Sequence, residues 1–153
     1  PAPFARHLTN YGKDLVDIIK GESEIAPDKK DRRFQDPTWQ HNRLYKATMQ
    51  SWLAMRKGFN GWIEDSGVDD ADKTRAKFVL DLLADALAPT NSLVGNPAAI
   101  KRVYETGGAS LLKGLQNAYN DLRHNNGMPS QVDGRPFKVG ENLATTPGAV
   151  VYK

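Results

Sequence analysis

Apolar residues recur every three or four positions over most of the chain, the spacing that places them on one side of an α-helix. Asp36 before Pro37, and Asn96 before Pro97, are typical of an N-cap followed by proline in the first helical turn. The pattern predicts four helices, at about residues 4–20, 37–64, 70–88 and 97–124. The expected fold is therefore mainly α, a helical domain of about four helices.

In the third and fourth predicted helices, the apolar pattern also indicates which side faces the inside of the domain. In the third, the apolar residues Phe78, Leu82 and Leu83 are expected to pack inside the domain. In the fourth, Gly107 and Gly108 fall on the apolar side of the pattern. One continuous helix would let another backbone approach closely at this pair, whereas the alternative is two helices that break there.

An aromatic stripe marks the second predicted helix, which holds all three tryptophans, Trp39, Trp52 and Trp62. Trp52, Phe59 and Trp62 recur at helical spacing together with a methionine. A stripe of this composition is usually core, and tryptophan is also enriched where proteins meet a partner. Both interpretations stay open, with core favoured.

The pattern changes toward the C-terminus, where residues 137–139 alternate and residues 149–152 are strand-like. We expect a short β-like segment there, cut from a larger sheet. The predicted organisation is an amphipathic helix and connector over 1–30, a helical domain over 31–136, and the start of that sheet over 137–153. The first helix either docks on the domain or lies on an apolar surface.

The composition and the motifs of the sequence exclude several kinds of functional site. The 153 residues include no cysteine, which excludes disulfides, thiolate metal ligands and a cysteine nucleophile within this sequence. The three histidines lack metal-ligand spacing, and no phosphate-binding loop or nucleophile motif is present. No apolar run approaches the ~18 residues of a membrane span. We therefore expect no catalytic residue, no metal, no cofactor and no transmembrane segment.

A short basic cluster covers residues 29–33, within a net charge of +3. Such a cluster can contact nucleic-acid phosphates. It can equally be a solvated loop whose arginines pair with carboxylates, and this is favoured because no stacking aromatics are interleaved. Nucleic acid is therefore not an expected partner.

Several motifs together resemble the N-terminal region of polyhydroxyalkanoate synthases, closest to those that polymerise medium-chain monomers. They follow the family's order from about residue 31 to the end of the sequence. The matching motifs are DRRF at 31–34, DPTW at 36–39, APTN at 88–91, NP at 96–97, ETGG at 105–108, SL at 110–111 and FKVGENLATTPGAVV at 137–151.

The resemblance implies an acyltransferase that moves 3-hydroxyacyl groups from coenzyme A onto a growing polyester. Its Cys-Asp-His residues would lie in an α/β-hydrolase domain absent from this sequence, and none of them maps here. The partners implied are that catalytic domain of the same polypeptide, a second copy in a homodimer, the polyester granule surface and phasin-type proteins, all in the cytoplasm. Residues expected to contact partners or pack domains are Arg32, Arg33, Phe34, Trp39, Trp52, Phe59, Trp62, Gly107 and Gly108.

The favoured hypothesis is a non-catalytic N-terminal domain of such a synthase, which supports dimerisation, activity and granule attachment. The alternative is an autonomous, phasin-like protein that binds the granule surface through its amphipathic helices.

Overall fold

A computed structural model describes residues 2–132, 134, 136–143, 145–146 and 148. The chain divides into two compact units, Pro1–Glu105 and Thr106–Lys153. Over the described residues the structure is helical and contains no strand, which confirms the mainly α prediction. The predicted boundaries at 30/31 and 136/137 stay predictions.

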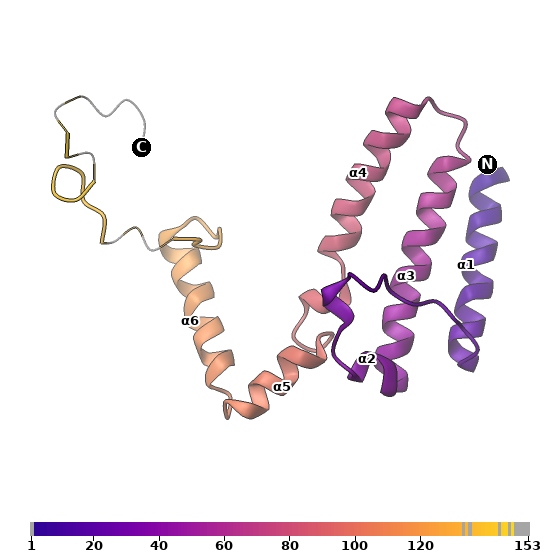
Figure 1. Cartoon of the computed structure of the whole chain (residues 1–153), viewed down its shortest axis with the longest axis horizontal. Coiled ribbons are helices and arrows are strands. Elements are labelled where there is room, and N and C mark those ends of the chain that lie inside the picture. The colour runs from indigo at the N-terminus through magenta and orange to yellow at the C-terminus, as the bar shows by residue number, and fades with distance from the viewer. Residues whose placement is uncertain (1, 133, 135, 144, 147, 149–153) are drawn as a thin grey trace. The chain divides into compact units, whose positions relative to one another are not determined.

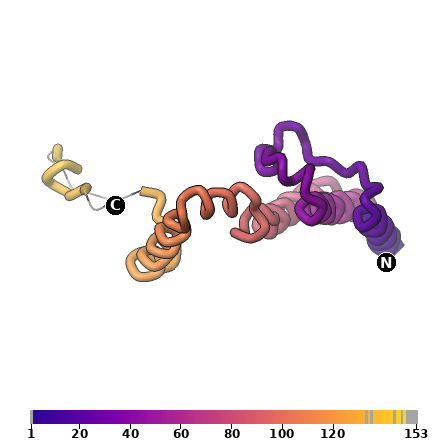
Figure 2. The backbone as a smooth tube through the Cα atoms, turned by 90° about the horizontal axis from the view of Figure 1, so that it is seen from below, coloured from indigo at the N-terminus to yellow at the C-terminus, as the bar shows by residue number. Residues whose placement is uncertain are grey.

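The first unit is a layer of three long helices with shorter elements attached. In Figure 1, α3 lies between α1 and α4. Figure 2 shows the segment between α1 and α3 on one side of this layer. The elements of the unit are α1 (Ala2–Lys20), η1 (Arg32–Phe34), α2 (Thr38–His41), α3 (Arg43–Glu64), α4 (Asp70–Ala86), η2 (Pro89–Asn91) and α5 (Pro97–Glu105).

The core of this unit lies where η1 and α2 meet α3. Trp39 is fully buried, and its ring packs edge-on against Phe34 at 5.0 Å and Tyr45 at 5.4 Å between ring centroids. Trp52 is buried beside them and donates a hydrogen bond from Nε1 to the Ala84 carbonyl at 3.0 Å, which ties α3 to α4. Trp39 and Trp52 of the second predicted helix thus serve the core, together with Phe34 of η1.

The predicted helix over 37–64 is two helices, because Asn42 interrupts it. Asn42 has extended backbone angles, and its side-chain oxygen accepts hydrogen bonds from the amides of Leu44 and Tyr45. An asparagine in this position is a favourable N-cap, so it starts α3 and separates it from α2.

The expected inward side of α4 was assigned wrongly. Lys77, Asp81 and Asp85, spaced four residues apart, pair with groups of η1 and α3, so this polar row lies on the inner side. Residues two positions away lie about 200° round a helix. Leu83 accordingly points outward, and the three residues expected to face inward, Phe78, Leu82 and Leu83, are exposed at 66%, 57% and 58%.

The predicted helix over 97–124 is also two helices, α5 and α6 (Ala109–His124). Gly107 and Gly108 have φ angles of +56° and +88°, a conformation that other residues adopt only at a cost. No atom lies within 4 Å of a Cβ built on either glycine. The pair therefore breaks the helix, and no described residue of the second unit makes the close backbone approach expected there.

The second unit consists of α6 and the residues that follow it. The apolar stripe of α6 is exposed, with Leu112 at 69% and Tyr119 at 58%. Within residues 137–143, one isolated bridge joins Val139 to Leu143 in a tight turn. The strand predicted at 149–152 lies outside the described residues.

Candidate functional site

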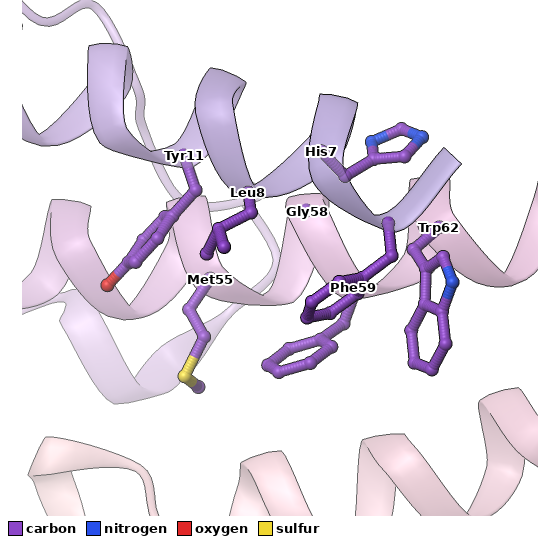
Figure 3. A pocket seen from close by; sticks show the side chains of 8 residues that line it. His7, Leu8, Tyr11, Met55, Gly58, Phe59 and Trp62 are labelled. Atoms are coloured by element: carbon purple, nitrogen blue, oxygen red, sulfur yellow. The ribbon is translucent and has the colours of Figure 1, made fainter. Parts of the chain in front are cut away.

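An apolar groove lies between α1 and α3, and Figure 3 shows the side chains that line it. Its volume is about 230 Å³. Leu8 on α1 and Met55 and Phe59 on α3 are directed to the same side of the two helices. The residues lining the groove are Phe4, His7, Leu8, Tyr11, Met55, Gly58, Phe59 and Trp62.

Gly61 of α3 lets α1 approach closely, and Gly58 lies beside it where the two helices meet. A Cβ built on Gly61 would lie 2.6 Å from Cε1 of His7, so a side chain there would push the histidine away. A Cβ on Gly58 would lie 3.9 Å from Cβ of Tyr11, an ordinary contact. These glycines are three residues apart on one side of the helix, and small residues in this pattern permit close helix packing.

Aromatic rings form one end of the groove. Phe4 meets Trp62 edge-on with ring centroids 5.2 Å apart, and Phe59 lies 6.4 Å from Trp62. These rings are only partly covered: Phe4 is 44% exposed, and Phe59 and Trp62 are each 36% exposed. Leu8 adds a further exposed apolar group at 57%. The groove thus presents aromatic and aliphatic surface to solvent.

Polar contacts hold the two helices together at the edges of the groove. His7 donates a hydrogen bond from Nε2 to Oδ2 of Asp65 at 2.6 Å, and Arg6 pairs with the same carboxylate. The hydrogen bond from His7, assisted by the charge of Arg6, lowers the pKa of Asp65. At the opposite end of α1, Arg43 donates to the Ile19 carbonyl at 2.9 Å. The contacts at Asp65 therefore border the apolar surface at one end, and the contact of Arg43 fixes the far end of α1 on α3.

The two arginines expected to contact a partner differ in their surroundings. Arg33 donates to both carboxylate oxygens of Asp31 at 2.8–3.2 Å and to Asp85 at 2.8 Å, and its guanidinium lies 4.9 Å from the Trp52 ring. The hydrogen bonds from Arg33 lower the pKa of Asp31. Arg33 is thus held by carboxylates, as the solvated-loop interpretation expects. Arg32 is exposed and lines a separate polar cleft.

The groove brings together two of the predicted contact residues, Phe59 and Trp62. Phe34, Trp39 and Trp52 lie in the core, and Gly107 and Gly108 lie in the second unit. The groove also uses residues that were not among the predicted contact residues, chiefly Leu8, Met55 and the two glycines of α3. Their helical spacing was visible, but which side of each helix meets the other depends on tertiary packing.

No helix among the described residues is both long enough and apolar enough to cross a bilayer. The described part of the chain likewise holds no cluster of three histidine or carboxylate side chains placed to bind a metal ion.

Comparison with known proteins places this chain beside bacterial polyester polymerases. The family described as the N-terminus of poly-beta-hydroxybutyrate polymerase (PhaC) matches residues 30–153. Poly(3-hydroxyalkanoate) polymerases 1 and 2 of Ectopseudomonas oleovorans are 48% and 47% identical to it over all 153 residues, which cover 27% of each polymerase. A poly(3-hydroxyalkanoate) polymerase subunit of Cupriavidus necator is 30% identical over 148 residues, 97% of this chain and 25% of that subunit.

The chain thus spans about a quarter of the length of the curated relatives it matches. No solved structure matches it.

Proposed function

Because this chain belongs to the family of poly-beta-hydroxybutyrate polymerase (PhaC) N-terminal regions, we propose that it is the non-catalytic part of a polymerase. The reaction of the whole polymerase would transfer 3-hydroxyacyl groups from coenzyme A onto a growing polyester. In this proposal the chain attaches the enzyme to its polymer through the groove between α1 and α3. The catalytic residues belong to an α/β-hydrolase domain of the same polypeptide.

The observation that carries the attachment role is the exposed apolar surface at the groove. Three aromatic rings and Leu8 are open to solvent on one side of α1 and α3. Exposed apolar patches on soluble proteins often mark sites that bind a partner or an apolar surface. Burying such surface contributes about 25 cal/mol per Å², so a polyester surface would be an effective partner.

The charged residues of α1 are placed to leave this contact undisturbed. Asp14 pairs with Lys57 of α3 at 3.7 Å, and Arg6 pairs with Asp65. Lys13 and Asp17 line a different surface of the helix. An apolar side next to the groove and a charged side away from it suit a helix that lies on an apolar surface.

The outward side of α4 supports the second part of the proposal, contact with the catalytic domain. Val79, Leu82 and Leu83 are exposed although the ion-paired row of the same helix faces inward. A helix with apolar residues outside is normally covered by another element. The relatives are about four times as long as this chain, so the remaining part of such a polymerase could cover the outward side of α4.

The proposal also includes homodimerisation of the polymerase, contact with phasin-type coat proteins, and a cytoplasmic location on storage granules. An autonomous, phasin-like protein is the competing function. Membership of the polymerase family favours the first of the two.

Co-sedimentation with particles of purified poly(3-hydroxyalkanoate) tests the attachment role. We expect the 153-residue chain to bind, and Leu8→Asp to weaken binding about tenfold, since a charge would be placed against the polymer. Asn10→Asp is the matched control, because it adds the same charge two residues away on the same helix. Absence of binding by the unaltered chain, or equal loss in both variants, would contradict the proposal.

A further inference from the structure

The groove between α1 and α3 is a shaped site as well as part of an apolar surface. We propose that it binds one alkyl side chain of the polyester, so that attachment depends on the length of that side chain. This inference rests on the proposed attachment role and assigns it to a particular site and ligand. It follows from the volume of the groove, its lining and its length.

The volume is suited to a small hydrocarbon group. An engineered apolar cavity of about 150 Å³ is known to bind benzene. The groove, at about 230 Å³, has room for a group somewhat larger than benzene. A methyl group would leave most of that space empty, whereas an alkyl chain of several carbons would fill it.

The lining is suited to the same ligand. Aromatic rings, the Met55 thioether and the Leu8 side chain surround the space. Among the described residues, the buried side-chain atoms without a hydrogen-bond partner are Trp39 Nε1 and Thr90 Oγ1, and neither residue lines the groove. Polar atoms are few in this lining, and one of them, Nε2 of His7, is already bound to Asp65, so the groove offers an alkyl chain a mainly apolar contact.

The length of the groove argues against a partner helix as its occupant. Along α3 it runs from Met55 to Trp62, seven steps of 1.5 Å each, or about 10 Å. A helix with its side chains is itself about 10 Å across. A docked helix would extend beyond this groove at both ends, while a single side chain of a polymer would fit within it.

The chemistry of the polymer supplies such a side chain. The relatives are named poly(3-hydroxyalkanoate) polymerases. In a 3-hydroxyalkanoate unit, an alkyl group projects from the carbon that carries the ester oxygen. With this alkyl group in the groove, the polar ester backbone would stay at the open side, in contact with water.

Binding should then strengthen as the alkyl group lengthens, until the groove is full. Complete burial of a methylene group corresponds to roughly a fourfold gain in affinity. The probes are methyl 3-hydroxybutanoate, methyl 3-hydroxyhexanoate and methyl 3-hydroxyoctanoate. A change in tryptophan emission reports binding, because Trp62 lines the groove whereas Trp39 and Trp52 are buried in the core away from it. We expect affinity to rise at least tenfold from the butanoate to the octanoate.

Two variants locate the site. Gly58→Leu places a side chain in the groove and should therefore abolish the dependence on chain length. The first atom of that side chain is accommodated, because a Cβ at position 58 meets only an ordinary contact at 3.9 Å. Gly12→Leu is the matched control, since Gly12 lies outside the groove with no atom within 4 Å of an added Cβ. Phe59→Ala should enlarge the groove and shift the preference toward longer esters. This variant keeps the test valid if Gly58→Leu fails to fold.

The outcomes separate this inference from the attachment role. If the chain binds polyester particles but the three esters bind equally, or Gly58→Leu keeps the length dependence, the inference is wrong and attachment stands. If particles are not bound but the esters show the expected order, the alkyl site stands without the attachment role. Stronger binding to phosphatidylcholine vesicles than to polyester particles would assign the groove to lipid chains and overturn the proposed ligand.

Discussion

Replacing Arg33 with methionine should be among the most destabilising changes at the surface of the first unit. The substitution keeps most of the aliphatic stem and removes the guanidinium. That group binds Asp31 through two nitrogens, binds Asp85 through a third at 2.8 Å, and stacks on Trp52 at 4.9 Å. Arg33 thereby connects η1 to α3 and α4.

The magnitude follows from these three contacts. The Arg33 side chain is 34% exposed, so each ion pair is discounted toward the value for exposed pairs, about 0.2–1 kcal/mol. The two-pronged pair with Asp31 belongs at the upper end of this range. Stacking on Trp52 adds about 0.5–1 kcal/mol. The expected total is about 2 kcal/mol, which corresponds to a fall in Tm of roughly 8 °C at about 4 °C per kcal/mol.

Thermal unfolding followed by circular dichroism measures this effect. The matched control is Arg75→Met, because Arg75 forms one exposed pair with Asp72 in its own helix. It should change stability by less than about 0.5 kcal/mol. Arg33→Lys should fall between the two, since it keeps the charge and loses the planar fork. If Arg33→Met is as mild as Arg75→Met, the assignment of Arg33 to a structural role is refuted.

Three further predictions concern the glycine pair, an ion pair and catalysis. Gly107→Ala and Gly108→Ala should each lower stability by about 1 kcal/mol in urea unfolding, because both positions have positive φ, whereas Gly114→Ala inside α6 should raise it by about 0.5–1 kcal/mol. Hydrogen bonds from Lys101 lower the pKa of Asp36 from 3.8 to about 2. The stability that this carboxylate contributes is complete above its ordinary pKa and is lost as pH falls toward 2; Asp36→Asn should flatten that part of the stability–pH curve. The chain alone should release no coenzyme A from 3-hydroxyacyl thioesters; release above background that persists through repurification would contradict a non-catalytic role.

The helical class and most helix ends could be predicted from local sequence. Asn96 accepts hydrogen bonds from the amides of Ala98 and Ala99, as expected for the cap of α5. Gly21, with φ of +84°, ends α1 as expected. These features depend on a few neighbouring residues, so sequence alone determines them.

The internal breaks were harder to predict, because the same residues are compatible with two conformations. Asn42 is tolerated within a helix, yet here its backbone is extended and its side chain caps the first turn of α3. Gly107 and Gly108 could be explained either by close packing or by positive φ. Only the backbone angles decide between these explanations.

The inner side of α4 could not be predicted from hydrophobicity. Its leucines suggested burial, yet Arg56 of α3 presents a guanidinium that pairs with Asp81 at 2.6 Å and with Asp85 at 3.2 Å. The polar row of α4 is therefore satisfied inside the unit. In the same way, the groove at Phe59 and Trp62 arises only when α1 packs on Gly58 and Gly61, a contact between segments about fifty residues apart.

The absence of cysteine from the sequence permits a direct test of attachment through the groove. In the variant Leu8→Cys, an environment-sensitive dye attached to the cysteine would lie at the groove. In Lys13→Cys, the same dye would lie on a different surface of α1. On addition of poly(3-hydroxyalkanoate) particles, we predict a blue shift in emission for the dye at position 8 and little change for the dye at position 13. Equal shifts at the two positions, or no shift at position 8, would contradict attachment of the polymer through this groove.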